Sequence, residues 1–491
     1  MTWEPLYTTE EMRAAEAAHP GPTLELMERA GKGVSDEILA RYPDARRVAV
    51  WCGTGANGGD GLVVAAELLR AGREPAVRLL GPEEKVAGDA AIVLGRAREA
   101  GVPFVAEHGA ADLAVDALFG TGFCGKPRPD AERAIGELNA GSVPVVAVDL
   151  PSGVDASTGR VAGAAVEAEV TVTFHARKIG HAIAPGRFHA GEVVVADIGL
   201  AGVQTRVRRA GRGLLGLVPR RTERDNKYTA GSVLVVGGSR GLTGAPSLTS
   251  EAALRAGAGI VTACVPASLN LVFEQRLIEV MTRPCADEDG VLVPDAADEI
   301  LAAAERAGAV ALGPGLGRTD GTRALVGFLL DRLDRPVVLD ADGLWALAGH
   351  LDWVFSRDAP TVLTPHAGEL ARLLGRSSAW VAANRLDAVQ SGADDTGAVV
   401  LLKGADTLVA APGRNPVVAD LGNPGLATAG SGDVLTGVVG AFLAKGMEGS
   451  LAATAAAAAC GAASWIAAER HGQAGMIARD VIEALSPALS A

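Results

Sequence analysis

A glycine-rich segment near the N-terminus has the composition of a phosphate-binding turn. Five of the nine residues 53–61 are glycine, and they lie between an apolar run at 48–52 and a helical pattern that begins at Leu62. Glycines let the backbone approach a ligand closely, and the free N–H groups at the start of a helix suit a phosphate. The next predicted strand ends at Arg78-Leu79-Leu80, without the carboxylate of a dinucleotide fingerprint. We therefore do not expect this segment to bind a dinucleotide for ordinary hydride transfer. The alternative to a phosphate site is a tight turn that binds no ligand.

Polar side chains also follow two further apolar runs in this half of the chain. Asp116 lies at the end of one run, Asp149 ends the next, and Ser152 lies just beyond it. Because the carboxyl ends of parallel strands line one crevice, these residues can converge with Asn57. Amide, carboxylate and hydroxyl oxygens suit a hard cation rather than zinc, and a second carboxylate stays available for proton transfer. The alternative is that the two aspartates only cap turns.

A second glycine-containing segment, at 428–433, precedes an apolar helical pattern in the C-terminal half. Glycines directly before a helix point several N–H groups at one place, where the helix dipole helps to stabilise a transferring phosphoryl group. Asp433 in the first turn could accept the proton of an attacking hydroxyl; alternatively, it only complements the helix dipole. Lys403 and Asp406 follow another predicted strand, so nucleotide contacts could come from that side too, and no Walker A sequence is present.

Composition limits the class of protein. The chain has 491 residues, a formal net charge of −13 and 48% hydrophobic residues, which excludes a small stapled scaffold and a disordered chain and disfavours a nucleic-acid binder. Its five cysteines form no C-x-x-C pair and are expected as reduced thiols. The N-terminus shows no signal-peptide pattern, which predicts a cytoplasmic location. The alanine-rich stretch 451–468 is expected to be a buried helix rather than a membrane span.

The elements that must position these residues follow from apolar periodicity. Helices are predicted over residues 9–40, followed by strands at 47–51, 76–80, 113–118, 143–149, 170–174 and 192–197. A charged bridge without a strand signal covers 201–230, after which strands are predicted at 232–236, 259–265, 309–312, 336–340, 361–364 and 398–403. Runs that are apolar on both faces belong in a parallel sheet covered by helices. We expect an α/β chain with two three-layer α/β/α domains, at residues 1–215 and 225–491.

Three motifs of the N-terminal half resemble the epimerase domain of NAD(P)H-hydrate repair enzymes over about residues 1–215. They are G-x-G-x-N-G-G-D-G at 53–61, V-D-A-L-F-G-T-G at 115–122 and V-D-L-P-S-G at 148–153. That family has a Rossmann-like doubly wound sheet, uses a potassium ion, and interconverts the R and S forms of NADH or NADPH hydrated at C6 of the ring. The resemblance implies that Asp149 faces the hydrated ring as the catalytic residue and that Asn57, Asp116 and Ser152 hold potassium. It also implies a dinucleotide cradle made of Ala56, Asn57, Gly58, Gly59, Asp60, Gly120, Thr121, Gly122, Phe123, Cys124, Gly125 and Lys126.

From about residue 225 to its end, the chain resembles the ribokinase-like dehydratase domain of the same enzymes. The resemblance rests on the segments 237–239, 312–317, 340–343, 364–369, 403–407 and 428–433. In that family ADP or ATP, with Mg²⁺, phosphorylates the ring hydroxyl of the S-hydrate, and loss of phosphate restores NADH or NADPH. The resemblance implies that Gly315, His366 and Asp433 contact the hydrate. It also implies an adenine-nucleotide site made of Lys403, Gly404, Ala405, Asp406, Thr407 and Gly432.

Together the two halves predict one polypeptide with two active sites that repair both epimers of NADHX and NADPHX. The expected partners are these hydrates and ADP or ATP, with neither nucleic acid nor membrane, and the chain is expected to form a homo-oligomer. Two alternatives remain open. The C-terminal half could be a kinase for a small vitamin-type alcohol, and the N-terminal half could be a nucleotide-sensing or interaction module, because a fold does not dictate chemistry.

Overall fold

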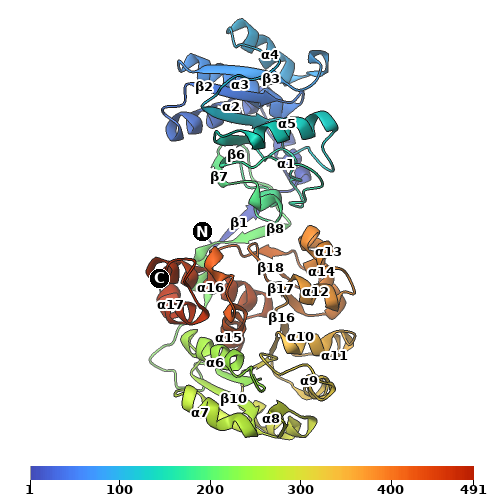
Figure 1. Cartoon of the computed structure of the whole chain (residues 1–491), viewed down its shortest axis with the longest axis vertical. Coiled ribbons are helices and arrows are strands. Elements are labelled where there is room, and N and C mark those ends of the chain that lie inside the picture. The colour runs from blue at the N-terminus through green and yellow to red at the C-terminus, as the bar shows by residue number, and fades with distance from the viewer. Residues whose placement is uncertain (1, 491) are drawn as a thin grey trace. The chain divides into compact units, whose positions relative to one another are not determined.

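The computed structural model describes residues 2–490, which divide into two compact units (Figure 1). One unit spans Pro5–Val207. The other comprises the residues up to Glu4 and those from Arg208 onward, and is called the C-terminal unit below. Each unit has its own sheet and its own buried core, so each is described separately.

The Pro5–Val207 unit is built on a six-stranded parallel sheet in the order β3, β2, β4, β5, β6, β7. The strands are β2 Arg47–Cys52, β3 Glu74–Leu79, β4 Leu113–Ala117, β5 Val145–Val148, β6 Val170–Phe174 and β7 Glu192–Ala196. All six strands expected from the sequence are confirmed close to their expected bounds. Parallel order places the carboxyl ends of β2, β4 and β5 at one edge of the sheet, where the polar residues follow.

Helices cover both faces of this sheet. They are α1 Thr9–Ala17, α2 Thr23–Arg41, α3 Ala56–Arg70, α4 Asp89–Glu99 and α5 Pro129–Ala140. Along β2, Val48, Val50 and Cys52 join a core shared with α2, α3 and α4, whereas Trp51 joins a second core that includes Ile135 of α5. Side chains alternate across a strand, so β2 must be apolar on both faces. These two cores make the expected three-layer α/β/α arrangement.

The C-terminal unit holds an eleven-stranded sheet in the order β1, β8, β19, β18, β17, β16, β15, β14, β9, β10, β11. Neighbouring strands from β17 to β11 are parallel, and β18 pairs antiparallel with β17 and β19. A separate hairpin joins β12 Asp287–Glu288 to β13 Val291–Leu292. The strand bounds are β1 Trp3–Leu6, β8 Val207–Ala210, β9 Ser232–Val236, β10 Ile260–Pro266, β11 Met281–Cys285, β14 Ala309–Leu312, β15 Val337–Leu339, β16 Thr361–Leu363, β17 Val399–Leu402, β18 Leu408–Ala410 and β19 Val417–Val418.

The expectation of no strand in 201–230 is wrong. Strand β8 forms inside this charged stretch and pairs with β19, placing Arg208 opposite Val417. Arg209 makes ion pairs with Glu4 at 2.9 Å and with Asp420 at 2.7 Å. The strand therefore depends on partners that are distant in sequence, which a local apolar pattern cannot reveal.

Two helical layers enclose the sheet of the C-terminal unit. Figure 1 shows α6, α15, α16 and α17 on one side of it and α9, α10, α12 and α14 on the other. The alanine-rich helix α16 is long and apolar enough to cross a membrane, yet most of its apolar window is buried inside the unit. The prediction of a buried helix is thus confirmed, and so is the α/β fold class. The helix bounds are α6 Gly244–Arg255, α7 Asn270–Arg276, α8 Ala297–Ala304, α9 Asp320–Arg332, α10 Asp342–Leu347, α11 Asp352–Phe355, α12 Ala367–Leu373, α13 Ser378–Ala383, α14 Arg385–Thr396, α15 Ser431–Ala444, α16 Gly449–His471 and α17 Ala478–Ser490.

Candidate active sites

The Pro5–Val207 unit contains a cavity beyond the carboxyl ends of β2, β4 and β5. Its volume is about 940 Å³, which lies in the upper part of the range for small-molecule sites. Five of the expected residues do not line this cavity. Four of them are buried, namely Gly58, Gly59, Asp116 and Ser152, and the fifth, Gly125, is exposed to solvent. The other residues expected at this site line the cavity: Ala56, Asn57, Asp60, Gly120, Thr121, Gly122, Phe123, Cys124, Lys126 and Asp149.

Packing explains part of the glycine content of residues 53–61. A Cβ atom on Gly58 would overlap the carbonyl oxygen of Gly53, and one on Gly53 would overlap the carbonyl oxygen of Leu118. Gly55 differs, because it directly precedes α3, lines the cavity and has open space where its Cβ would lie. The tight turn and the open helix N-terminus are therefore both present.

Asp149 directly follows β5 and lines the cavity, although it is only 4% exposed. Its φ of 67° is left-handed, which is uncommon outside glycine. Its carboxylate accepts hydrogen bonds from Thr121 N at 2.9 Å, Thr173 Oγ1 at 3.1 Å and Lys178 Nζ at 2.6 Å. Thr121 Oγ1 donates a fourth hydrogen bond. Four donors match the about four lone-pair sites of a carboxylate, so the group is held in one orientation.

Lys178 is the residue that sequence reasoning missed in this site. Its fully buried ammonium also donates to Thr173 Oγ1 at 2.7 Å and to the carbonyl oxygen of Phe174 at 3.0 Å. Burial raises the pKa of Asp149, but the charge and hydrogen bond of Lys178 lower it to about 2. Asp149 is therefore ionised at neutral pH and can accept a proton. The only signal in the sequence is a lysine shortly after the buried strand β6.

Of the three expected potassium ligands, Asn57 lies near this carboxylate, whereas Asp116 and Ser152 are hydrogen-bonded to each other. Ser152 donates to Asp116 through its hydroxyl at 2.6 Å and its N–H at 2.7 Å. Within residues 2–490, the buried Oδ1 and Nδ2 of Asn57 find no hydrogen-bond partner. A Cβ on Gly120 would lie 2.8 Å from Asn57 Oδ1 and 3.1 Å from Asp149 Oδ2. A buried amide oxygen without a partner is costly, and a hard cation such as potassium would satisfy that of Asn57.

In the C-terminal unit, the segment 428–433 leads into α15. Gly430 adopts a φ of 87°, and a Cβ on Gly432 would lie 3.3 Å from Lys403 Nζ. Burial raises the pKa of Asp433 to about 7; Asp340 adds to this shift and Lys403 opposes it. A carboxylate with a pKa near neutrality is suited to general acid–base work. Lys403 and Asp433, expected to contact different molecules, thus lie in one site.

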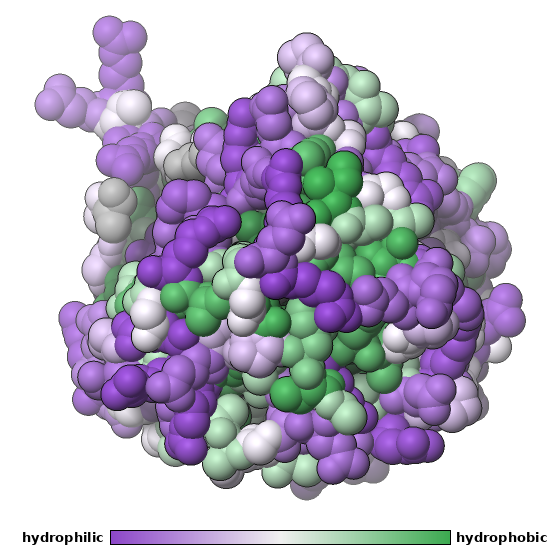
Figure 2. Space-filling view, turned by 90° about the horizontal axis from the view of Figure 1, so that it is seen from above, coloured by the Kyte–Doolittle hydropathy of each residue, from purple (hydrophilic) through white to green (hydrophobic). Residues whose placement is uncertain are grey.

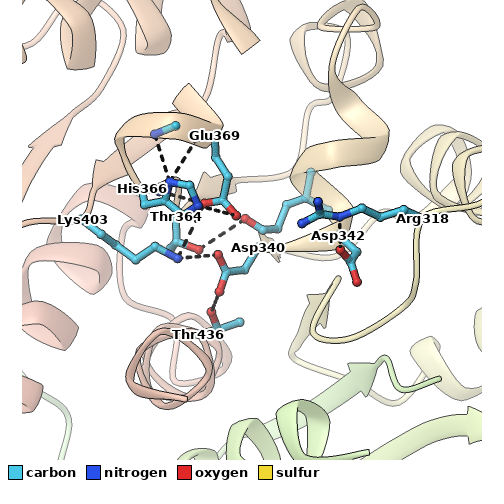
Figure 3. A network of polar contacts seen from close by, with 10 residues as sticks. Arg318, Asp340, Asp342, Thr364, His366, Glu369, Lys403 and Thr436 are labelled. Atoms are coloured by element: carbon cyan, nitrogen blue, oxygen red, sulfur yellow. Dashed lines mark hydrogen bonds and ion pairs between the residues drawn. The ribbon is translucent and has the colours of Figure 1, made fainter. Parts of the chain in front are cut away.

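A network of charged residues surrounds the amine of Lys403 (Figure 3). Lys403 Nζ lies 2.9 Å from Asp340 Oδ1 and 3.9 Å from Glu369 Oε2. Thr436 of α15 donates to Asp340 Oδ2 at 2.7 Å. Burial lowers the pKa of Lys403, but Asp340 and Glu369 outweigh this effect and raise it overall. Asp340, Glu369 and Thr436 were not expected as site residues; the first two fall in segments that carry the family resemblance.

His366 and Gly315 have clear structural roles. His366 caps α12, and its Nδ1 accepts hydrogen bonds from Gly368 N at 3.0 Å and Glu369 N at 3.3 Å. In a neutral ring the proton is then on Nε2, and this side chain is 61% exposed. Gly315 has a φ of 64°, and a Cβ there would lie 2.6 Å from the carbonyl oxygen of Leu242. The exposed ring edge of His366 leaves room for a substrate contact.

A buried ion pair stabilises the segment 403–407. Asp406 is 1% exposed and lies 2.6 Å from the guanidinium of Arg385. Arg385 also donates to the carbonyl oxygen of Lys403, and Thr407 Oγ1 donates to that of Gly404 at 2.9 Å. Asp406 therefore shapes this loop through its side chain, whereas Lys403 extends toward Asp340 and Glu369.

The fold and the sites define a class of protein: a Rossmann-like unit and a ribokinase-like unit, each with a glycine-containing helix N-terminus beside a buried aspartate. Residues 233–487 match the family model described as NAD(P)H-hydrate dehydratase, and residues 23–180 match that of YjeF-related protein N-terminus. A ribokinase-like superfamily protein from Enterococcus faecalis V583 has a TM-score of 0.50 and 22% identity, covering 59% of this chain and 98% of its own. That likeness supports the fold alone.

Two curated relatives span almost the whole chain. A bifunctional NAD(P)H-hydrate repair enzyme from Moorella thermoacetica is 40% identical, over 98% of this chain and 96% of its own length. Another, from Escherichia coli, is 36% identical, over 94% of this chain and 88% of its own. The chain belongs to the family of bifunctional NAD(P)H-hydrate repair enzymes, which confirms the family expected from its motifs.

We predict that Asp149→Ala lowers the rate of exchange between the R and S hydrates by about 10²- to 10⁴-fold, as for loss of one acid–base group. The exchange is followed by separating the two epimers over time. Asp433→Asn, in the other unit, is the matched control and should exchange the epimers at the unmodified rate. Near-normal exchange in Asp149→Ala would remove this carboxylate from the mechanism.

We predict that Lys178→Met makes the exchange sensitive to acid. With Lys178 the pKa of Asp149 is about 2, so Asp149 stays ionised throughout the neutral range. Without the ammonium, burial raises this pKa and the hydrogen bonds of Thr121 only partly oppose it, so activity should fall as the pH is lowered toward mildly acidic values. The measurement is the pH profile of kcat/KM, with Lys445→Met as the control. Profiles of the same shape in the two variants would show that Lys178 does not set the ionisation of Asp149.

Proposed function

We propose that this chain restores hydrated NADH and NADPH in two steps, with epimerisation in residues 1–215 and dehydration in residues 225–491. The observation that carries this proposal is the same in both units. A buried aspartate follows a parallel strand and forms an ion pair with a lysine, Asp149 with Lys178 and Asp340 with Lys403. Each pair lies beside a helix that begins with glycines.

In the epimerase site, Asp149 carries the proton transfers. The lone pair of the ring nitrogen expels the hydroxyl from C6, which consumes one proton and releases water. Addition of water to the other face of the ring then releases one proton, so the cycle needs no net proton. The ammonium of Lys178, 2.6 Å from Asp149, supplies the first proton, and the carboxylate of Asp149 accepts the second and returns it to Lys178. Because Asp149 is already ionised, its carboxylate is ready to accept the proton of the incoming water.

Asn57, Asp116 and Ser152 would hold potassium beside this carboxylate. Burial raises the pKa of Asp116 to about 6, although hydrogen bonds from Ser152 lower it, so its ionised form lacks a full counter-charge. A bound potassium ion would supply positive charge to the oxygens of these residues. The unpaired amide of Asn57 supports this assignment most directly.

In the dehydratase site, ADP or ATP with Mg²⁺ would supply the phosphoryl group. Asp433 takes the proton of the ring hydroxyl as its oxygen attacks phosphorus, and the N–H groups at the start of α15 stabilise the transferring charge. Phosphate then leaves C6 far more readily than hydroxide, and loss of one proton from the neighbouring ring carbon C5 forms the double bond of the reduced ring. We assign Gly315, His366 and Asp433 to the hydrate. The segment 403–407 and Gly432 would bind the nucleotide, with Lys403 between the two substrates.

Two further expectations concern the molecule in its cell. We propose a cytoplasmic location and a homo-oligomeric state, in agreement with the sequence composition. The net charge of −13 supports the expectation that nucleic acid and anionic lipid surfaces are not partners.

We predict that epimerisation depends on potassium. Replacing potassium chloride by tetramethylammonium chloride at constant ionic strength should slow the exchange of epimers by at least about tenfold, because the amide of Asn57 loses a partner and the carboxylate of Asp116 loses a counter-charge. Asn57→Ala should be slow in both salts, whereas Asp433→Asn should keep the dependence. Equal rates of the unmodified chain in the two salts would contradict the cation site.

We predict that Asp433→Asn abolishes the nucleotide-dependent recovery of NADH absorbance while epimerisation continues. In the unmodified chain, recovery should rise with pH through about 7, because Asp433 accepts a proton only when ionised. Both are followed by absorbance with purified S-hydrate and ADP. If dehydration survives in Asp433→Asn, this residue only caps the helix. Accumulation of a stable phosphorylated alcohol in the unmodified chain would instead favour a small-molecule kinase.

A further inference from the structure

The cavity of the Pro5–Val207 unit is more basic than the chain that surrounds it. Seven basic and four acidic side chains line it, although the formal net charge of the whole chain is −13. A cavity with excess positive charge concentrates anionic ligands. The two hydrates differ in negative charge, because NADPHX carries an additional phosphate on the 2′-oxygen of its adenosine ribose.

Several of the cations in this wall already have an acidic partner. The pairs are Arg78 with Glu137, Lys126 with Glu132, Arg133 with Asp130 and Lys178 with Asp149. Arg78 is further occupied by stacking over the ring of Trp51, 4.6 Å from the centroid. Within residues 2–490, no ion pair is formed by the three remaining cations, which are Arg13, Lys85 and Arg128. These three side chains are available to a ligand.

Arg13 and Lys85 come from different parts of the fold. Arg13 of α1 approaches the loop that orients Asp149, since its guanidinium lies 3.8 Å from the position of a Cβ on Gly122. Lys85 ends the short 3₁₀ helix Glu83–Lys85 that follows β3. Strand β3 is at the sheet edge and is separated from β5 by β2 and β4. Lys85 follows β3 and Asp149 follows β5. The ends of these two strands are therefore three strand spacings of about 4.8 Å apart, a span that suits an extended dinucleotide.

The position of β3 in the sheet indicates which part of a dinucleotide Lys85 could contact. In doubly wound nucleotide-binding sheets, the strand that follows the glycine-rich turn and its helix ends beside the adenosine ribose. A carboxylate at that position binds the 2′-hydroxyl, whereas a basic residue accommodates a 2′-phosphate. Here β2, the glycine turn, α3 and β3 follow in this order.

Among the described residues, no acidic side chain from the start of β3 to Lys85 lines the cavity. The four acidic residues that line the cavity are Glu16, Asp60, Asp130 and Asp149. None of them belongs to the segment that runs from the start of β3 to Lys85. Glu83, in the same 3₁₀ helix as Lys85, does not line the cavity and forms an ion pair with Arg98. The segment that follows β3 therefore offers the cavity a cation and no carboxylate.

We propose that Lys85 binds the 2′-phosphate of NADPHX, so that the epimerase site prefers the phosphorylated hydrate over NADHX. This inference rests on the proposed epimerase function and adds a substrate preference to it. The ammonium of Lys85 makes a charge-assisted contact with the phosphate that NADHX cannot offer. Arg13, at the reacting end, meets parts that both hydrates share.

The test compares the two hydrates in the full-length chain. The unmodified chain should show a higher kcat/KM for NADPHX than for NADHX. Lys85→Ala should reduce kcat/KM for NADPHX by about ten- to hundredfold, mainly through KM, and leave the value for NADHX nearly unchanged. Lys85→Glu should invert the preference. The matched control is Lys32→Ala, which removes an exposed lysine of α2 outside the cavity lining.

A second measurement uses stable fragments. Inhibition of NADHX epimerisation by 2′,5′-ADP should be stronger than by 5′-AMP in the unmodified chain, and this difference should vanish in Lys85→Ala. Equal losses for both hydrates in Lys85→Ala would place Lys85 on the shared pyrophosphate, and no loss for either would place it outside the site; both results overturn the proposal. Absence of exchange with either hydrate in the unmodified chain would instead overturn the proposed epimerase function.

Discussion

The buried ion pair between Lys178 and Asp149 is the contact on which the Pro5–Val207 site depends. A carboxylate that is almost completely removed from water is strongly disfavoured unless an opposite charge and hydrogen bonds compensate it. Lys178 and the two threonines provide both. The C-terminal unit meets the same constraint with Asp340 and Lys403, again at the carboxyl ends of parallel strands. In each unit, the lysine comes from a later strand than the aspartate.

The two ion pairs lead to different acid–base behaviour. Asp149 is the partner of its lysine, and its pKa is lowered to about 2. Asp433 is not the direct partner of Lys403; burial, together with Asp340 and Asp342, raises its pKa to about 7. The first carboxylate, already ionised, suits the acceptance of a proton from the incoming water. The second suits removal of a proton from a hydroxyl while phosphorus is attacked.

Much of the architecture could be predicted because buried parallel strands are apolar on both faces, and such runs stand out in a sequence. The inner strands β2, β4, β5 and β6 and the central strands of the second sheet are buried in this way, whereas the edge strands β3 and β7 are partly exposed. Strand β8 breaks it, since Arg208 and Arg209 lie in a charged stretch that β19, Glu4 and Asp420 stabilise from a distance. Glycines mark the turns in the sequence, but their cause, such as the approach of Gly53 to Leu118, appears only in three dimensions.

The sequence by itself determined the family, the two α/β units and the segments that carry Asn57, Asp149 and Asp433, because these follow from local motifs and periodicity. Only the tertiary structure decided which charges face one another. It joined Lys178 to Asp149 and Lys403 to Asp340, left the amide of Asn57 without a partner among residues 2–490, and placed Lys85 in the cavity lining without an ion pair to another described residue. Electrostatic energy depends on distance and burial, and neither quantity is written in the order of residues along the chain.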